Sequence, residues 1–330
     1  MTAVGAAAPV RLDLAGGWTD VPPYSAREGG VVVAAAVQLH AYAEVRPREQ
    51  GYHLDSMDLG QTQEYPHLES LRGDGPLPLL RAGIRLLGAG PCALSTRSDA
   101  PPGSGLGSSG AIDVALVAAL AASGGRSLST REIADLACRL EGQEAGIPGG
   151  RQDQFAAAFG GFLRLTFRDP DARVESIALE PDFATELERR MLLCYTGASR
   201  FSGDTIGRVM RAYERGDATV AGALDGLRRA AEAMGEALRA GDLARIGALL
   251  SENWRLQQRL DAGMSTPEMR RLEAVMDEAG CLGGKAAGSG AGGSMFFLAP
   301  DDPTPAREAV LRLGMRVLPV RWATTGVRLC

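Results

Sequence analysis

Asp99-Ala-Pro-Pro-Gly-Ser-Gly-Leu-Gly-Ser-Ser-Gly-Ala111 is a glycine- and serine-rich loop that runs directly into an apolar helix expected over 108–122. Its glycines carry no Cβ, so the backbone can take positive φ and its N–H groups can approach an anion. The helix start adds unpaired N–H groups and the positive end of the helix dipole. The hydroxyls of Ser104, Ser108 and Ser109 can bind phosphate oxygen or Mg²⁺. The stretch therefore predicts a phosphate-binding loop; a flexible loop before a buried helix is the alternative.

The bulk composition is that of an ordinary globular protein. A chain of 330 residues with 45% hydrophobic and 23% charged residues can bury a substantial core, and its length favours two domains. The net charge of −5 indicates no nucleic-acid partner. Because the sequence has neither a signal-peptide pattern nor an apolar run of about 18 residues, we expect a cytoplasmic protein without a membrane partner.

The reactive side chains are few and scattered. The five cysteines include no Cys-x-x-Cys pair, so neither a disulfide framework nor a zinc site is indicated. The three histidines lie outside the glycine-rich motifs and are expected to be single surface or core residues. Lys285 is conspicuous as the only lysine among 35 basic residues.

Hydrophobic periodicity and turn residues predict a mixture of strands and helices, with a domain boundary near 181–190 that divides the chain into 1–185 and 186–330. Strands are expected over 10–14, 31–37, 40–45, 91–98, 161–167, 174–179, 191–195, 294–298, 317–322 and 327–329. Helices are expected over 77–87, 108–122, 129–145 (opened by the capping box Ser129-Thr-Arg-Glu132), 151–159, 202–214, 218–240, 242–260, 266–280 and 303–313.

Arg11-Leu-Asp-Leu-Ala-Gly-Gly-Trp-Thr-Asp20 is a strand that ends in two glycines and is followed by Trp18, Thr19 and Asp20. A carboxylate accepts hydrogen bonds from adjacent hydroxyls, and an aromatic face packs against the C–H side of a sugar ring. The segment therefore suits polyol binding. The alternative is a turn in which Thr19 and Asp20 only satisfy local backbone groups.

Glu141-Gly-Gln-Glu-Ala-Gly-Ile-Pro-Gly-Gly-Arg-Gln-Asp-Gln154 brings two carboxylates together across a tight Gly-Pro-Gly-Gly turn. Phosphoryl transfer needs a metal ligand, a group that takes or orients the proton of the acceptor hydroxyl, and a cation. Glu141, Asp153 and Arg151 can fill these roles in that order. Solvated loop charge is the alternative.

Gly283-Gly-Lys-Ala-Ala-Gly-Ser-Gly-Ala-Gly-Gly-Ser294 is a second glycine-rich loop. Residues 288–293 fit Gly-x-Gly-x-x-Gly, but a strand is expected next, where a dinucleotide-binding fold needs a helix. Lys285 is not followed by Ser or Thr, so the loop is not a P-loop. A Ser-His-Asp hydrolase is disfavoured too, because no Gly-x-Ser-x-Gly elbow is present.

Together, in this order, the glycine-rich motifs resemble those of the galactokinase, homoserine kinase, mevalonate kinase and phosphomevalonate kinase superfamily. The loop at 99–111 resembles its Pro-x-x-x-Gly-Leu-Gly-Ser-Ser-Ala signature, with Gly110 at the usual first alanine. Residues 11–20 resemble its substrate motif, and residues 283–294 its C-terminal glycine motif. The resemblance implies a two-domain α+β fold, with an N-terminal domain like ribosomal protein S5 domain 2 and a ferredoxin-like C-terminal domain.

The resemblance also implies an ATP- and Mg²⁺-dependent kinase and assigns roles to residues of this chain. The ATP-binding loop would be Pro102, Gly103, Ser104, Gly105, Leu106, Gly107, Ser108 and Ser109. The metal ligands would be Ser109, or Ser108, and Glu141, and the catalytic residues Asp153 and Arg11. The substrate contacts would be Arg11, Trp18, Thr19, Asp20, Gly150, Arg151, Asp153, Gly288, Ser289 and Gly290.

Within the superfamily, Gly-Gly-Trp-Thr-Asp followed by Pro-Pro-Tyr is similar to D-glycero-D-manno-heptose 7-phosphate kinases and to the kinase domain of L-fucokinases. We therefore expect a sugar 1-kinase, monomeric or homodimeric, that phosphorylates the anomeric hydroxyl of a heptose 7-phosphate. A fucokinase- or galactokinase-like kinase of a free hexose and a catalytically silent sugar- and ATP-binding sensor are the alternatives. The candidate cations for a substrate phosphate are Arg27, Arg151, Arg164 and Arg200.

Overall fold

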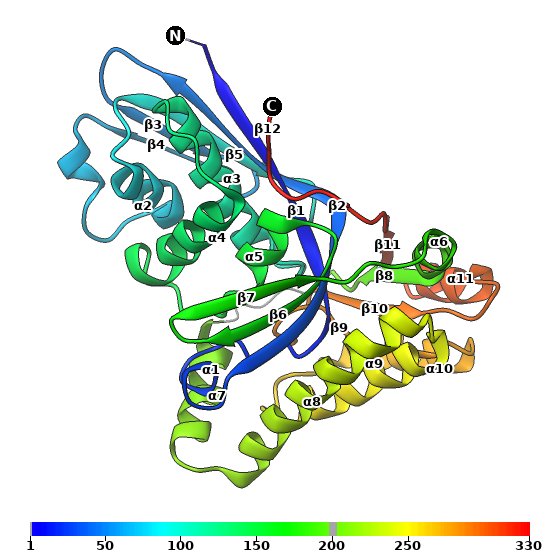
Figure 1. Cartoon of the computed structure of the whole chain (residues 1–330). Coiled ribbons are helices and arrows are strands. Elements are labelled where there is room, and N and C mark those ends of the chain that lie inside the picture. The colour runs from blue at the N-terminus through cyan, green and yellow to red at the C-terminus, as the bar shows by residue number, and fades with distance from the viewer. Residues whose placement is uncertain (1, 198–202) are drawn as a thin grey trace.

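The computed structural model describes residues 2–197 and 203–330, and within these ranges two β-sheets are flanked by helices (Figure 1). The first sheet has the central strand order β12-β1-β2-β5-β3-β4, with β6 and β7 attached to β2. Its strands are β1 (Val4–Ala15), β2 (Gly30–Pro47), β3 (Tyr52–Ser56), β4 (Gln61–Tyr65), β5 (Cys92–Ser98), β6 (Phe162–Arg168), β7 (Asp171–Ser176) and β12 (Arg328–Leu329). The second sheet has the order β11-β8-β10-β9, and its strands are β8 (Met191–Tyr195), β9 (Gly283–Ala286), β10 (Ser294–Leu298) and β11 (Arg316–Leu318).

The helices account for most of the remaining chain. They are α1 (Tyr24–Arg27), η1 (Leu68–Leu71), α2 (Pro78–Leu87), α3 (Ser108–Ser123), α4 (Thr130–Arg139), η2 (Leu140–Glu144), α5 (Gln152–Phe159), α6 (Pro181–Arg190), α7 (Gly203–Glu214), α8 (Ala218–Ala240), α9 (Leu243–Gln258), α10 (Pro267–Glu278) and α11 (Thr304–Arg312). This mixture in two sheets confirms the predicted α+β class. No helix within the described ranges combines the length and the apolar character needed to cross a membrane.

Strand β2 runs the whole height of the first sheet, where two separate strands were expected. Its first half pairs with β6 and its second half with β5, and the register against β1 shifts where Gln38 and Leu39 lie between the two halves. A β-bulge of this kind bends a strand without ending it. The hairpin of β3 and β4 was not expected, because β4 reads Gln-Thr-Gln-Glu-Tyr and shows no apolar alternation.

Helix α3 is the buried axis of the first half. Its residues from Gly110 to Ala121 are almost all inaccessible, and it packs against β1, β2 and the helices α4 and α5. Such all-round burial explains its apolar sequence on every face. Ser129 caps α4 through the predicted capping box, but α4 ends at Arg139. The chain then continues through the π-helical turn η2, which holds Glu141.

The second half does not separate cleanly from the first. Residues 181–190, expected to be a boundary, form helix α6, and the C-terminal strand β12 returns to pair with β1 (Figure 1). Helix α8 packs against β1 and β2, and α9 against β9 and β1. The strand expected over 317–322 ends at Leu318, and Trp322 forms a single bridge with Val37.

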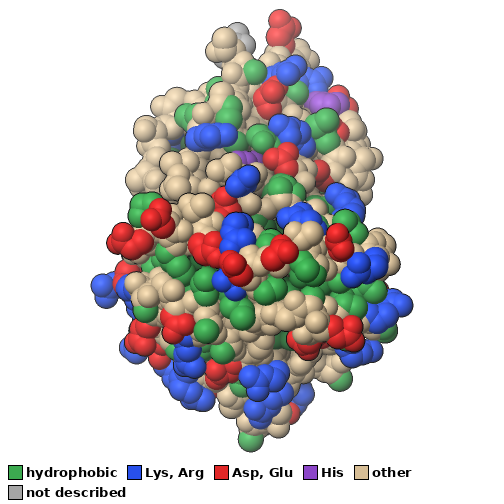
Figure 2. All heavy atoms as spheres, turned by 90° about the vertical axis from the view of Figure 1, so that its right-hand side faces the viewer, with side chains coloured by type: hydrophobic (Ala, Val, Ile, Leu, Met, Phe, Trp, Pro, Cys, Tyr) green, Lys and Arg blue, Asp and Glu red, His purple; other side chains and the backbone are tan. Residues whose placement is uncertain are grey.

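On the face shown in Figure 2, acidic and basic side chains are interspersed. That face therefore carries no extended basic surface of the kind that nucleic acids require.

Candidate active site

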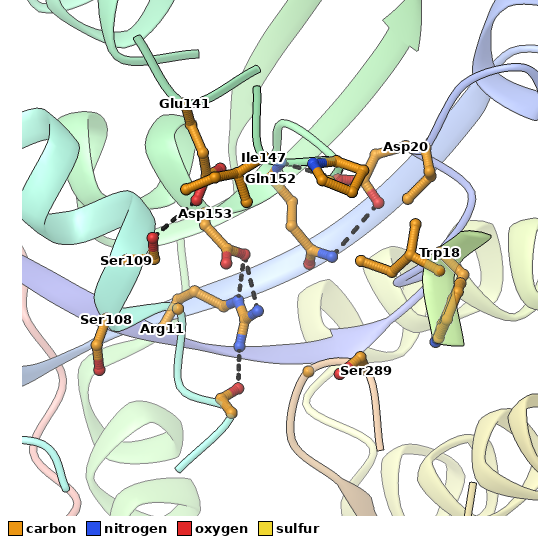
Figure 3. Close-up of a pocket in the computed structure, with 18 of the residues that line it drawn as sticks. Arg11, Trp18, Asp20, Ser108, Ser109, Glu141, Ile147, Gln152, Asp153 and Ser289 are labelled. Atoms are coloured by element: carbon orange, nitrogen blue, oxygen red, sulfur yellow. Dashed lines mark hydrogen bonds and ion pairs between the residues drawn. The ribbon is translucent and has the colours of Figure 1, made fainter. Parts of the chain in front are cut away.

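A cavity of about 520 Å³ lies where β1, the loop before α3, η2 and the start of α5 converge (Figure 3). Ser108, Ser109 and Glu141 lie toward one end of it, Trp18 and Asp20 toward the other, and Arg11 and Asp153 between them. Its lining residues are Arg11, Trp18, Asp20, Val21, Gly103, Ser104, Gly105, Gly107, Ser108, Ser109, Glu141, Ile147, Pro148, Gly149, Gly150, Gln152, Asp153, Ile206, Gly288 and Ser289. Segments far apart in sequence thus share one site.

The loop before α3 has the backbone that its glycines allow. Gly103, Gly105 and Gly107 have φ values of 66°, 76° and 76°, and Gly107 caps the start of α3. The loop lies directly against the second glycine-rich loop: a Cβ on Gly105 would lie 2.5 Å from the carbonyl oxygen of Ala287, and one on Gly288 would lie 2.6 Å from that of Gly105. Both loops therefore need glycine to reach backbone contact.

Arg11 and Asp153 form the central ion pair of the cavity. The Nε and Nη2 atoms of Arg11 lie 2.8 and 2.7 Å from Asp153 Oδ1, and its Nη1 donates to the carbonyl of Gly105 at 2.7 Å. Burial lowers the pKa of Arg11, but the neighbouring carboxylates of Asp153 and Asp13 outweigh burial and raise that pKa overall. Arg11 is therefore a permanent cation that holds Asp153 beside the loop before α3.

Glu141 is placed at the loop end of the cavity. Ser109 Oγ donates to Glu141 Oε1 at 2.8 Å, and Gln154 Nε2 donates to Oε2 at 2.6 Å. Burial raises the pKa of Glu141, and the charge of Asp153 raises it further, while the bonds from Ser109 and Gln154 oppose the shift. A nearby cation would thus be favoured electrostatically.

Asp20 occupies the opposite end and is completely buried. The backbone N–H of Gln152 donates to Asp20 Oδ2 at 2.9 Å, and its side-chain Nε2 lies 3.4 Å from Oδ1. Burial raises the pKa of Asp20 to about 6, the charge of Asp153 adds to the shift, and the backbone hydrogen bonds oppose it. Trp18, with φ of 80°, and the apolar residue Ile147 line the cavity near this carboxylate.

Three predicted substrate residues, Thr19, Arg151 and Gly290, do not line the cavity. Thr19 is fully buried, and its hydroxyl donates to the Gly16 carbonyl at 2.7 Å, which is the local turn role given above as the alternative. Arg151 is directed to the β6–β7 turn, where its Nη2 pairs with Asp169 at 2.5 Å and its Nη1 donates to the Pro170 carbonyl at 2.7 Å. The cation beside Asp153 is Arg11 instead.

Several other predicted site residues also lie outside the cavity lining. Pro102, Leu106 and Gly290 are not lining residues, although the Leu106 carbonyl accepts from the Arg11 backbone N–H at 3.0 Å. Among the arginines considered for a substrate phosphate, Arg164 pairs with Glu175, Arg27 lies over the ring of Tyr213, and Arg200 lies outside the described residues.

Gln152 is the functional candidate that the sequence analysis missed. It lies in a recognised motif, but its contact with Asp20 joins residues 132 positions apart, and nothing in the local pattern indicates it. The structure also explains why glycine stands at position 110. A Cβ there would lie 2.5 Å from Asp153 Cβ, so glycine lets α3 and α5 approach more closely than alanine would.

Gly150 should be essential to the Asp20 end of the cavity. A Cβ at this position would lie 2.0 Å from Asp20 Oδ2, so Gly150→Ala must displace the carboxylate. A misplacement of about 1 Å can cost about 100-fold, so we expect kcat/KM for the acceptor substrate to fall by about that factor while the nucleotide Kd stays unchanged. Gly222→Ala, which meets open space within α8, is the control and should stabilise the protein by about 0.5–1 kcal/mol. Unchanged kcat/KM in Gly150→Ala would contradict this placement.

The cavity combines a glycine-lined helix start, the Arg11–Asp153 ion pair and the buried carboxylate of Asp20. This arrangement suits a small-molecule kinase. Residues 78–161 match the GHMP kinases N terminal domain, and residues 234–314 match GHMP kinases C terminal. The chain belongs to the GHMP kinase family, and it is an enzyme that transfers phosphate to a hydroxyl group.

Individual relatives are similar over nearly the whole chain. It is 34% identical to D-glycero-alpha-D-manno-heptose 7-phosphate kinase of Campylobacter jejuni, over 90% of this chain and 88% of that protein. It is 28% identical to the bifunctional fucokinase/GDP-fucose pyrophosphorylase of Arabidopsis thaliana, over 89% of this chain but only 29% of that protein. The crystal structure of a D-glycero-D-manno-heptose 1-phosphate kinase from Bacteroides thetaiotaomicron superposes with a TM-score of 0.80 at 27% identity, covering 99% and 98% of the two chains.

Proposed function

We propose that this GHMP-family sugar kinase transfers the γ-phosphate of ATP to the anomeric hydroxyl of a heptose 7-phosphate. The observation that carries the proposal is the arrangement of one cavity, in which the Arg11–Asp153 pair separates a phosphate loop from the buried carboxylate of Asp20. The names of the relatives from C. jejuni and B. thetaiotaomicron support a heptose phosphate as the substrate class. The anomeric position of transfer rests on the resemblance of the Gly-Gly-Trp-Thr-Asp segment to sugar 1-kinases.

ATP is the phosphate donor of GHMP kinases, and the loop from Gly103 to Ser109 suits its phosphates. The positive-φ glycines present backbone N–H groups, and the start of the 16-residue helix α3 adds its own. Ser108 supports this role: its hydroxyl is buried at the cavity wall and has no hydrogen-bond partner among the described residues.

The residues at this end also fit Mg²⁺. Ser109 and Glu141 offer hard oxygen ligands and already touch at 2.8 Å. Mg²⁺ in nucleotide sites takes one or two carboxylates and completes its shell with phosphates and water. In the described part of the chain no group of three or more His, Cys, Asp or Glu could hold a metal ion. The ion would neutralise charge on the phosphates.

Asp153 is the group that receives or orients the acceptor proton. Its Oδ1 is held by Arg11, while Oδ2 lies toward Gly107 of the phosphate loop, 3.1 Å from where a Cβ of that glycine would be. The sugar hydroxyl oxygen bonds to the γ-phosphorus, the bond to the β–γ bridging oxygen breaks, and ADP leaves. The hydroxyl proton passes to Asp153 and then to water. Arg11 keeps Asp153 in place and offsets charge on the transferred group.

Asp20 supplies recognition of the sugar. An ionised carboxylate accepts hydrogen bonds from neighbouring hydroxyls, and Gln152 fixes its orientation. The Oε1 atom of Gln152 and the Nε1 atom of Trp18 are buried without a partner among the described residues, and both side chains line the cavity. They would add one acceptor and one donor for sugar hydroxyls.

The affinity for sugar should depend on the protonation of Asp20. The pKa of Asp20 is raised to about 6, so the carboxylate is ionised above that pH and neutral below it. Because only the ionised form accepts two hydroxyl hydrogen bonds, kcat/KM for sugar should fall about tenfold per pH unit below pH 6. Burial sets most of this midpoint, and the charge of Asp153 adds to the shift. A flat pH profile between 5 and 7 would remove Asp20 from sugar recognition.

The proposal is tested by coupled ADP release with a panel of heptose 7-phosphates and free hexoses. Release driven by a heptose 7-phosphate supports it. Preference for L-fucose or galactose would replace the substrate with a free hexose. Saturable sugar binding without sugar-dependent ADP release would instead establish a silent sensor.

A further inference from the structure

Lys285 has no role in the mechanism above, although it is the only lysine of the chain. It lies on β9 of the second sheet and is fully buried. Its Nζ is 2.9 Å from Asp13 Oδ2, donates to the Asp13 carbonyl at 2.7 Å, and lies 5.3 Å from the centre of the Phe296 ring. The lysine ammonium is a compact point charge, and here it makes both contacts with Asp13 in an enclosed space.

Asp13 connects this buried ammonium to the catalytic strand. It lies on β1 two residues after Arg11 and is itself buried. Its Oδ2 faces Lys285, and its Oδ1 accepts from the backbone N–H of Gly288 at 3.1 Å. The same carboxylate therefore joins β1, β9 and the second glycine-rich loop.

Arg11 stands between two carboxylates. Its Nη2 is 2.7 Å from Asp153, while its Nη1 is 4.0 Å from Asp13 Oδ1. A buried carboxylate without a counter-ion is strongly unfavourable and would draw the nearest cation. Lys285 satisfies Asp13, so Arg11 remains with Asp153.

We infer that Lys285 is a positioning residue: by neutralising Asp13 it prevents that carboxylate from pulling Arg11 away from Asp153. The inference rests on the proposed roles of Arg11 and Asp153. It assigns to the second sheet a direct part in the alignment of the catalytic pair, beyond the backbone contact of the two glycine-rich loops.

The test compares Lys285→Met, Asp13→Asn and the double variant Asp13→Asn/Lys285→Met. In Lys285→Met the unpaired Asp13 should capture Arg11, and kcat should fall by about 100-fold, the lower range for a positioned base, while KM for ATP and sugar changes by less than about threefold. The double variant removes the competing charge as well and should recover kcat to within about tenfold of wild type. If the Lys285–Asp13 ion pair only held the two halves of the chain together, the additional loss of Asp13 would not restore kcat.

Arg239→Met is the matched control, because it breaks the ion pair of α8 with Glu175 on β7, away from the cavity, and should leave kcat unchanged. A folded double variant as slow as Lys285→Met, or a fully active Lys285→Met, would overturn the inference. If Lys285→Met does not fold, the double variant is compared with wild type: kcat within about tenfold supports the inference, and kcat lowered by about 100-fold overturns it.

A crystal structure of Lys285→Met gives a readout that needs no turnover. We expect the Arg11 guanidinium to contact Asp13 and to leave Asp153. Arg11 still bound to Asp153 would refute the inference, even if the protein phosphorylates no sugar. Absence of sugar-dependent ADP release in the wild type would refute the proposed function alone.

Discussion

Asp153→Asn should lower kcat by about 10³-fold, within the range of about 10²–10⁴ that a positioned proton acceptor contributes. The amide keeps the size of the carboxylate and can still accept from Arg11, but it cannot take the acceptor proton. ATP affinity should stay within about threefold of wild type, because the proposed nucleotide site is the loop and the start of α3. Steady-state kinetics and calorimetric titration with ATP measure both quantities.

Asp153→Asn should also change the pH dependence of sugar binding. The charge of Asp153 contributes to the raised pKa values of both Asp20 and Glu141. Asp153→Asn should therefore shift the pH dependence of sugar binding below the wild-type midpoint, and equilibrium binding reports this without turnover. Asp135→Asn, which breaks an exposed pair with Arg131, is the control and should change neither quantity. Wild-type kcat in Asp153→Asn would exclude Asp153 from the chemistry.

Asp20→Asn should lower kcat/KM for sugar by about 10³-fold. Two charge-assisted hydrogen bonds of about 1.5–3 kcal/mol each are weakened or lost when the carboxylate becomes an amide. Turnover at saturating sugar should suffer less, because Arg11 and Asp153 are not altered. A sugar kcat/KM within tenfold of wild type would contradict the proposed recognition.

The same substitution should stabilise the fold at high pH. Asp20 has a pKa of about 6 in the folded protein against an ordinary value of 3.8, so the folded state binds its proton more tightly than the unfolded chain. The ionised group thus destabilises the fold above pH 6 by about 3 kcal/mol, and this penalty shrinks as the pH falls from 6 to 3.8. Asp20→Asn should therefore raise Tm at pH 8 and lose that advantage at pH 4, which thermal unfolding at both pH values measures.

The parts of the candidate site that come from one continuous segment could be predicted from the residues of that segment. The loop before α3 was predicted from glycine spacing, because positive φ and a helix start are local properties. Glu141 and Asp153 were predicted from the chemistry of one segment and Arg11 from motif resemblance, and the cavity brings the three together. Strand β4 was not predicted, because it is stabilised by pairing with β3 and its polar side chains do not indicate that pairing.

Contacts between distant segments could not be predicted. The choice between Arg11 and Arg151 as the cation at Asp153 depends on the β6–β7 turn, where Asp169 captures Arg151. The pairing of Asp13 with Lys285 spans 272 residues and joins two sheets. Sequence composition singled out Lys285 as unusual, but only the fold gives it a partner.

The most direct test of a sugar 1-kinase is the structure of its product. D-glycero-D-manno-heptose 7-phosphate should be incubated with ATP and Mg²⁺, and the product analysed by ³¹P NMR with proton correlation. We predict a second sugar-phosphate resonance, coupled to the anomeric proton and formed in step with ADP. If the sugar keeps a single phosphate resonance after prolonged incubation, or if the second sugar phosphate couples to any other sugar proton, that result would contradict the account.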